Sequence, residues 1–193
     1  KNSYSKIIEI FYGQLITTIE TPDNKILSKS FDPICFYTLP IPSPTNNEQV
    51  TIYDCFDLFC SSELLTGDNQ YYCDKKKEYF DAYKKTKIWK FSNIVIICLK
   101  RFNNNMRKIC KPIDFPTTLD LNKYCEGYET ANYYDLYGIC NHSGGTFGGH
   151  YYAYCKNKNG NWYNYNDSCV TNIREEDIIT SAAYCLFYRK SIL

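Results

Sequence analysis

The sequence reads Gly148-Gly149-His150-Tyr151-Tyr152-Ala153-Tyr154 and, after a short polar stretch, Trp162-Tyr163-Asn164-Tyr165-Asn166-Asp167-Ser168. Aromatic and apolar residues predict strands at 151–155 and 162–165, and the Asn-Gly pair between them is typical of a hairpin turn. If this loop is centred near Lys158 or Asn159, His150 lies opposite Asn166 or close to it. Directly opposite residues have Cβ atoms about 5 Å apart, so Asn166 is within reach of one imidazole nitrogen. The stretch therefore predicts the base and the orienting residue of a nucleophilic triad.

The nucleophile that such a triad needs is harder to find. The chain has 11 cysteines, most of them inside apolar runs such as 96–99 and 183–186, where a free cysteine usually acts as a small buried hydrophobe. A reactive thiol commonly sits at a helix N-terminus that lowers its pKa. No cysteine here follows a Gly/Asn-rich loop and opens a predicted helix. We therefore expect the attacking cysteine to lie outside these 193 residues.

These residues resemble the histidine box of the ubiquitin-specific proteases, a papain-like family of deubiquitinating cysteine peptidases. The family pattern G-H-Y-x-A-Y-x-K-N, then W-Y-x-F-[ND]-D-x-x-V, is similar to 149–157 and 162–170. Further family segments match in chain order at 11–15, 31–33, 39–42, 51–56, 63–65, 99–102, 115–116, 119–121 and 181–188. The resemblance covers essentially the whole chain. It implies an α+β, papain-like fold with β fingers at about 12–90 and a mainly antiparallel β palm at about 91–193.

The resemblance also implies that part of the catalytic domain is missing. The family's cysteine box, G-L-x-N-x-G-N-T-C-Y, belongs to its thumb and precedes the first matching segment. Residues 1–193 are thus expected to be a partial catalytic domain, the fingers and palm, with the catalytic cysteine on an N-terminal thumb segment.

Many members of the family hold a structural zinc ion with two C-x-x-C pairs in the fingers. The matching positions here are Thr21 and Asn24, then Cys73 and Lys76. One thiolate in four cannot form a closed tetrahedral site. We expect no metal and no cofactor, with fingertips held by packing alone.

The resemblance assigns roles to the residues around the histidine. His150 is the expected general base, and Asn166 is the expected orienting residue. Asp167 is the alternative, since some members carry Asp at one or both positions. Adjacent strand residues face opposite ways, so we expect only one of the two, preferably Asn166, to contact the ring nitrogen.

The glycine-rich stretch 143–149 is expected to be a mobile loop over the active site. Gly148 and Gly149 would leave room for the Leu-Arg-Gly-Gly tail of ubiquitin. Tyr151 and His142 would line the same channel, although core or rim positions remain open for both.

The implied function is hydrolysis of the bond after the C-terminal glycine of ubiquitin, with ubiquitin and ubiquitinated proteins as partners. Two alternatives stay open: a catalytically inactive ubiquitin-binding module, and a structural or interaction domain with a tyrosine-rich core.

Composition excludes several other classes. A net charge of +1 gives no electrostatic footprint for nucleic acid. The longest apolar run, 94–99, is far shorter than the roughly 20 residues of a membrane helix. An odd number of scattered cysteines argues against a disulfide scaffold and favours reduced thiols in the cytosol or nucleus.

Local patterns predict the remaining elements. Thr51 and Asp54 have the spacing of a capping box, and Ile52, Cys55, Phe56 and Phe59 continue as one helical stripe. A continuous apolar strand at 94–102 is expected to be buried on both faces. The other predicted elements are a helix end at 7–11, strands at 14–20, 26–39, 133–141 and 182–190, and a brief helix at 174–179.

Overall fold

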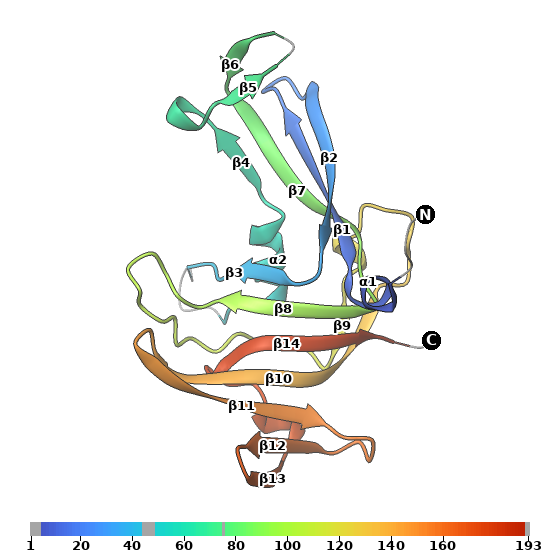
Figure 1. Ribbon diagram of the computed structural model, residues 1–193, viewed down its shortest axis with the longest axis vertical. Coiled ribbons are helices and arrows are strands. Elements are labelled where there is room, and N and C mark those ends of the chain that lie inside the picture. Colours follow the sequence, from blue (N-terminus) through green and yellow to red (C-terminus); the bar gives the residue numbers. More distant parts are fainter. Residues whose placement is uncertain (1–4, 44–48, 75, 192–193) are drawn as a thin grey trace.

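The computed structural model describes residues 5–43, 49–74 and 76–191, which form two β-sheets joined at an angle (Figure 1). The smaller, fingers sheet has the strand order β2-β1-β7-β4, formed by β2 (Ile26–Ile34), β1 (Gly13–Glu20), β7 (Ala82–Lys90) and β4 (Ser62–Leu65). A separate hairpin of β5 (Tyr71–Cys73) and β6 (Glu78–Phe80) lies at its far end. These strands form an extended antiparallel sheet within the range 12–90 expected for the fingers, and the assignment of that range as fingers stays a prediction.

The larger, palm sheet has the strand order β13-β12-β11-β10-β14-β8-β3, with β9 also paired to β10. Its strands are β13 (Cys169–Ile173), β12 (Trp162–Asn166), β11 (Gly148–Lys156), β10 (Tyr133–Gly145), β14 (Ala183–Lys190), β8 (Ile94–Lys100), β3 (Tyr37–Pro40) and β9 (Thr118–Asp120). All neighbours are antiparallel except β3 and β8. Strands thus dominate an α+β fold, as the sequence predicts.

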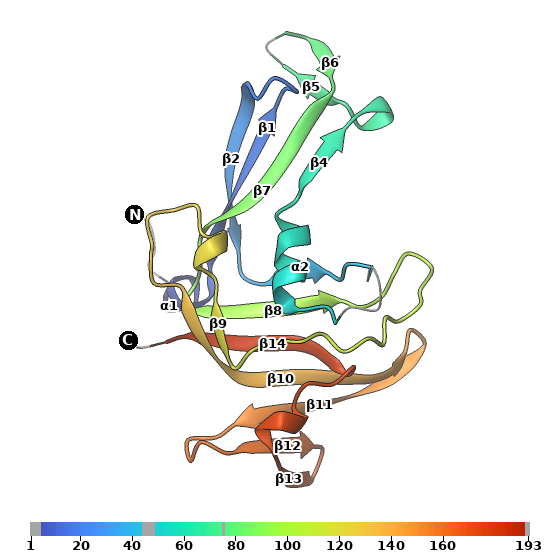
Figure 2. The ribbon, with the colours of Figure 1, turned by 180° about the vertical axis from the view of Figure 1, so that it is seen from behind.

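The helices are short. α1 (Lys6–Phe11) precedes β1, and α2 (Ile52–Phe59) lies at the junction of the two sheets (Figure 2). Single 3₁₀ turns occupy Gly67–Asn69, Asn122–Tyr124 and Glu175–Asp177. None of the helices in the described residues is long and apolar enough to cross a membrane.

The capping box predicted at α2 is present in full. The Thr51 N–H donates to Asp54 Oδ2 at 2.8 Å, and the Asp54 N–H donates to Thr51 Oγ1 at 3.2 Å. These bonds satisfy amide groups that have no partner inside the helix. They fix the start of a helix whose buried face packs into the core.

Only one face of β8 is buried in the core. Val95, Ile97 and Leu99 are at most 1% exposed and belong to the same buried cluster as α2. Ile96 and Cys98, on the alternate face, are only half-buried. The expectation that this strand is buried on both faces is therefore wrong.

The strand predicted at 26–39 is broken. β2 ends at Ile34, and β3 starts again at Tyr37, where the chain turns to pair in parallel with β8. Residues 37–40 lie inside the range 12–90 expected for the fingers, yet they extend the palm sheet. Tyr37 is 1% exposed, and its burial against Phe56 and Phe91 accounts for the change of direction.

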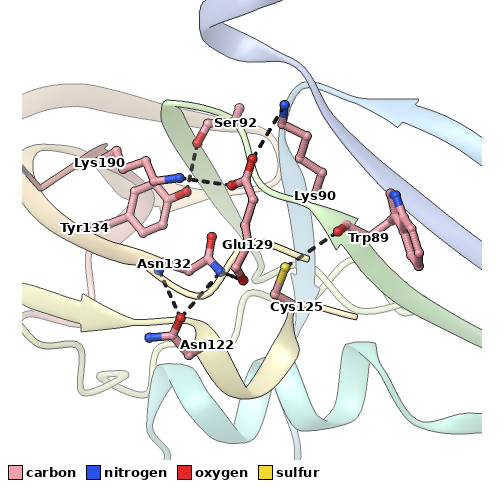
Figure 3. A network of polar contacts seen from close by, with 9 residues as sticks. All are labelled: Trp89, Lys90, Ser92, Asn122, Cys125, Glu129, Asn132, Tyr134 and Lys190. Atoms are coloured by element: carbon pink, nitrogen blue, oxygen red, sulfur yellow. Dashed lines mark hydrogen bonds and ion pairs between the residues drawn. The ribbon is translucent and has the colours of Figure 1, made fainter. Parts of the chain in front are cut away.

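A polar network ties the base of the fingers to the palm (Figure 3). The Glu129 carboxylate pairs with Lys190 of β14 at 3.0 Å and with Lys90 of β7 at 3.5 Å. Beside it, the Tyr134 hydroxyl donates to the Ser92 carbonyl at 2.9 Å. Glu129 therefore connects β7 of the fingers sheet to β14 of the palm sheet through two ion pairs.

The positions matching the family's zinc ligands lie at the far end of the fingers. Thr21 and Asn24 belong to the β1–β2 turn, Cys73 is buried at the end of β5, and the Lys76 ammonium lies 4.7 Å from the Phe80 ring centroid. In the described part of the chain, no three or more His, Cys, Asp or Glu side chains are grouped so as to hold a metal ion. The metal-free fingertip stays a prediction.

Candidate active site

The glycine-rich stretch before His150 is a hairpin and not a loop. The β10–β11 ladder continues through His142↔Tyr151, Ser143↔His150 and Gly144↔Gly149 to Gly145↔Gly148. Only Thr146 and Phe147 remain as the turn, and Phe147 is 98% exposed. The expectation of a loop at 143–149 is wrong for the backbone, because its glycines pair across strands, and the expected mobility of this stretch stays a prediction.

The next hairpin brings the predicted base and orienting residue together. Pairs run from Lys156↔Trp162 to Ala153↔Tyr165, which centres the turn on Asn159. Continued by one residue, this register places Asn166 across from Tyr152, two positions from His150 on the same face. The expected proximity is confirmed as a diagonal pairing, and His150 Nε2 lies 2.6 Å from Asn166 Oδ1.

This contact fixes the chemistry of the ring. Asn166 Oδ1 can only accept, so Nε2 carries the proton that it donates. In the neutral imidazole the lone pair is then on Nδ1, at the other side of the ring. Nδ1 is the atom left to take a proton from a nucleophile.

Asp167 reaches the same nitrogen from farther away. Its Oδ2 lies 3.8 Å from His150 Nε2, an ion-pair distance when the ring is protonated and too long for a hydrogen bond. Asp167 has φ 51° and belongs to the turn between β12 and β13, so strand alternation does not apply to it. Only Asn166 lies within hydrogen-bond distance of the ring nitrogen, in agreement with the expected preference for Asn166, while Asp167 approaches from the turn at ion-pair distance.

The four residues expected to bind substrate line one cavity. It measures about 370 Å³ and is bounded by Gly148, Gly149, Tyr151 and His142, together with Phe102, Gly145 and Thr146. His142 is 5% exposed, and its ring centroid is 4.7 Å from that of Tyr151. Burial lowers the pKa of His142, and the nearby Lys108 ammonium adds to the effect.

The two glycines play different parts in this cavity. A Cβ built on Gly149 would lie 2.2 Å from His142 Nε2 and 2.4 Å from the Ser143 carbonyl oxygen, whereas one on Gly148 would meet nothing within 4 Å. Gly149 is therefore required by the protein's own packing and not by a substrate alone. Gly148 faces open space.

Phe102 and Tyr184 complete the aromatic wall behind His142, and sequence reasoning did not single them out as site residues. Their ring centroids lie 5.9 and 5.8 Å from that of His142. The signal was present, because both belong to segments that match the family, 99–102 and 181–188. The contact itself depends on the pairing of distant strands.

None of the thiols in the described residues is hydrogen-bonded to the His150 ring. Burial raises the pKa of Cys55 to about 12 and that of Cys60 to about 11, as in structural cysteines. Cys110 and Cys169 are exposed.

Comparison with known proteins gives one consistent result. The profile of the ubiquitin carboxyl-terminal hydrolase family matches residues 1–188. Ubiquitin carboxyl-terminal hydrolase 2 from Gallus gallus is 36% identical over 189 residues, which cover 95% of this chain and 53% of that protein. Ubiquitin carboxyl-terminal hydrolase 21 from Homo sapiens is 34% identical, over 96% of this chain and 34% of that protein.

Solved structures agree. The Ubp8/Sgf11/Sus1/Sgf73 DUB module of SAGA bound to ubiquitin aldehyde contains a chain that is 30% identical with a TM-score of 0.82, covering 100% of this chain and 44% of that one. A yeast SAGA DUB module structure gives 31% identity and a TM-score of 0.84, with the same coverage. The chain thus spans about half the length, or less, of the relatives it matches. It belongs to the ubiquitin carboxyl-terminal hydrolase family.

Proposed function

We propose that this chain forms the fingers and palm of a thiol-dependent deubiquitinase, which hydrolyses the isopeptide or peptide bond after the C-terminal glycine of ubiquitin. The observation that carries the proposal is the 2.6 Å contact between His150 Nε2 and Asn166 Oδ1. A hydrogen bond on Nε2 presents Nδ1 as a base, which is the arrangement a cysteine nucleophile requires.

His150 acts as general base and then as general acid. Its Nδ1 takes the proton of the attacking thiol, and the thiolate adds to the carbonyl carbon of the scissile bond. The resulting imidazolium protonates the leaving lysine amine. Water, deprotonated by His150, then attacks the thioester and releases ubiquitin.

Asn166 holds the tautomer and the direction of the ring throughout this cycle. Asp167, at 3.8 Å from Nε2, adds electrostatic stabilisation when the ring is charged. Asn166 is the third triad member in this proposal, because only its distance is that of a hydrogen bond.

The cavity of Gly148, Gly149, Tyr151 and His142 is the proposed contact for the glycine-rich end of the substrate. Support comes from the open space beside Gly148 and from the half-exposed Tyr151 ring, which is 56% accessible. His142 is the buried support of the Tyr151 ring.

The nucleophile is proposed to come from a thumb segment outside these 193 residues. In support, the described thiols make no hydrogen bond to His150, and the relatives are about twice as long or longer. Ubiquitin and ubiquitinated proteins are the proposed partners, with no nucleic acid or membrane partner. A cytosolic or nuclear location is proposed from the scattered, odd-numbered cysteines.

The test uses the intact, full-length protein and ubiquitin that carries a thiol-reactive group at its C-terminus. We expect one covalent adduct at a cysteine outside residues 1–193, formed at least about 100-fold more slowly by the His150→Ala variant. A Cys169→Ser variant, which removes an exposed thiol within the chain, should react like the wild type.

Other outcomes separate the alternatives. No adduct, with non-covalent ubiquitin binding retained, identifies an inactive ubiquitin-binding module. If neither an adduct nor ubiquitin binding is observed, the remaining alternative is a structural or interaction domain.

A further inference from the structure

Three cysteines from distant parts of the sequence lie side by side on the half-covered face of the palm sheet. Cys185 of β14 pairs directly with Cys98 of β8 on one side and with Cys140 of β10 on the other. All three are half-buried, neither enclosed in the core nor fully exposed. The active-site chemistry proposed above uses none of them.

Cys98 and Cys185 are the closer pair. Their Sγ atoms are 3.2 Å apart, which is within reach of a sulfur–sulfur hydrogen bond. Directly opposite residues of an antiparallel ladder have Cα atoms about 4.5–5.5 Å apart, and disulfides span about 4.4–6.8 Å between Cα atoms. A bond of about 2.05 Å therefore needs only a small side-chain rotation, with both strands kept in register.

The geometry points to Cys98 and Cys185 as a dithiol modification site, which we propose a peroxide oxidises to an interstrand disulfide. The Cys98 thiolate attacks one peroxide oxygen, the O–O bond breaks, and the alkoxide or hydroxide leaves with a proton to give Cys98 sulfenic acid. Cys185 sulfur then attacks Cys98 sulfur, and the sulfenic hydroxyl leaves as water with the Cys185 proton. With hydrogen peroxide, two thiols and one peroxide give one disulfide and two waters.

The local electrostatics favour this order of attack. The hydrogen bond between the two thiols lowers the pKa of Cys98, and the same hydrogen bond together with burial raises the pKa of Cys185. Cys98 is thus the attacking thiolate and Cys185 the resolving thiol. A lower pKa raises the fraction of thiolate at neutral pH, so we expect Cys98 to react with peroxide faster than the exposed Cys169.

The chain offers a clean measurement, because trypsin releases each member of the pair on a peptide with a single cysteine. Cys98 lies on 91–100, Cys185 on 175–189, and the exposed Cys169 on 159–174, whereas Cys140 shares 124–156 with Cys125 and Cys155. The intact protein is treated with graded hydrogen peroxide, blocked with an alkylating reagent, digested without reductant and analysed by mass spectrometry. We expect a 91–100/175–189 cross-link at doses that leave the 159–174 peptide alkylated.

Matched variants decide the assignment. Cys140→Ser should keep the cross-link, and Cys98→Ser should leave the 175–189 peptide fully alkylated at the same dose. Fully alkylated 91–100 and 175–189 in the wild type would overturn the proposal. A cross-link from 175–189 to 124–156 in its place would overturn the choice of Cys98.

Discussion

Asn166 meets His150 diagonally across the β11–β12 hairpin, with Oδ1 2.6 Å from Nε2, although the register places Asn166 opposite Tyr152. The Tyr152 ring in turn stacks near the His150 ring at an interplanar angle of 17°. The imidazole is therefore held by an amide at one edge and by an aromatic neighbour on one face. This arrangement orients the ring even though 46% of the histidine side chain is exposed.

Replacing the two candidate orienting residues should give unequal losses of activity. Asn166→Ala removes the hydrogen bond at 2.6 Å and should lower kcat by about 10²-fold or more, because the ring loses its tautomer and direction. Asp167→Ala removes only the longer contact and should cost less than about fivefold. Steady-state hydrolysis of a ubiquitin C-terminal fluorogenic substrate by the intact protein measures both. A larger loss for Asp167→Ala would reverse the assignment.

The two glycines before His150 give a second matched pair. Gly149→Ala should destabilise the fold by about 2 kcal/mol, because its Cβ would collide with His142 and with the Ser143 carbonyl. Gly148→Ala meets open space and should stay within about 0.5 kcal/mol of the wild type. Urea denaturation followed by tryptophan fluorescence checks both. Equal stability of the two variants would show that the hairpin can shift to accommodate the Cβ at position 149 without a loss of stability.

His142 should make stability depend on pH. Burial lowers its pKa, so the unfolded chain binds a proton before the folded protein does as the pH falls. The stability that comes from burying His142 in its neutral form is fully present above the ordinary histidine pKa of about 6.5. It is lost as the pH falls from there through the lower pKa that His142 has in the folded protein. His142→Asn should flatten this loss by at most about 1.4 kcal/mol per pH unit, the limit for one proton. Urea midpoints between pH 7.5 and 5 test it, and parallel curves for the two proteins would contradict it.

Arg101 is expected to be the side chain of the palm whose loss is most damaging. It is fully buried, and its guanidinium donates to the carbonyls of Ala183, Ile109 and Lys111 at 2.5, 2.9 and 2.8 Å. Arg101→Ala leaves these acceptors unpaired and should cost about 3 kcal/mol or more.

The exposed Arg107 nearby is the control for Arg101. Its side chain is exposed and its backbone N–H makes the bond to Asn103, so Arg107→Ala should stay within about 0.5 kcal/mol of the wild type. Thermal unfolding of the two variants compares them. A similar loss in both would argue against a structural role specific to Arg101.

Much of this architecture could be predicted where local chemistry and tertiary structure agree. Thr51 and Asp54 fixed the start of α2, because a capping box needs only neighbours in sequence. The Asn159-Gly160 turn likewise placed His150 near Asn166, because a hairpin's register follows from its loop.

Elements that depend on distant partners were missed. β7 reads Ala82-Tyr83-Lys84-Lys85-Thr86-Lys87, a charged sequence that becomes a central strand only because β1 and β4 flank it. Gly144 and Gly145 favour a loop by propensity, yet the ladder to β11 makes them strand residues. β13 was missed because it is short and largely exposed and gains its order from pairing with β12.

The paired glycines at the end of the β10–β11 hairpin have a thermodynamic consequence. A loose flap beside the histidine would lose conformational entropy each time a partner ordered it, and that loss would weaken binding. Here the ladder reaches Gly145↔Gly148, so the backbone freedom of these glycines has been given up during folding. A ligand bound in the proposed substrate cavity would therefore meet an already paired hairpin, and most of the ordering cost would fall on the stability of the protein and not on the affinity for that ligand.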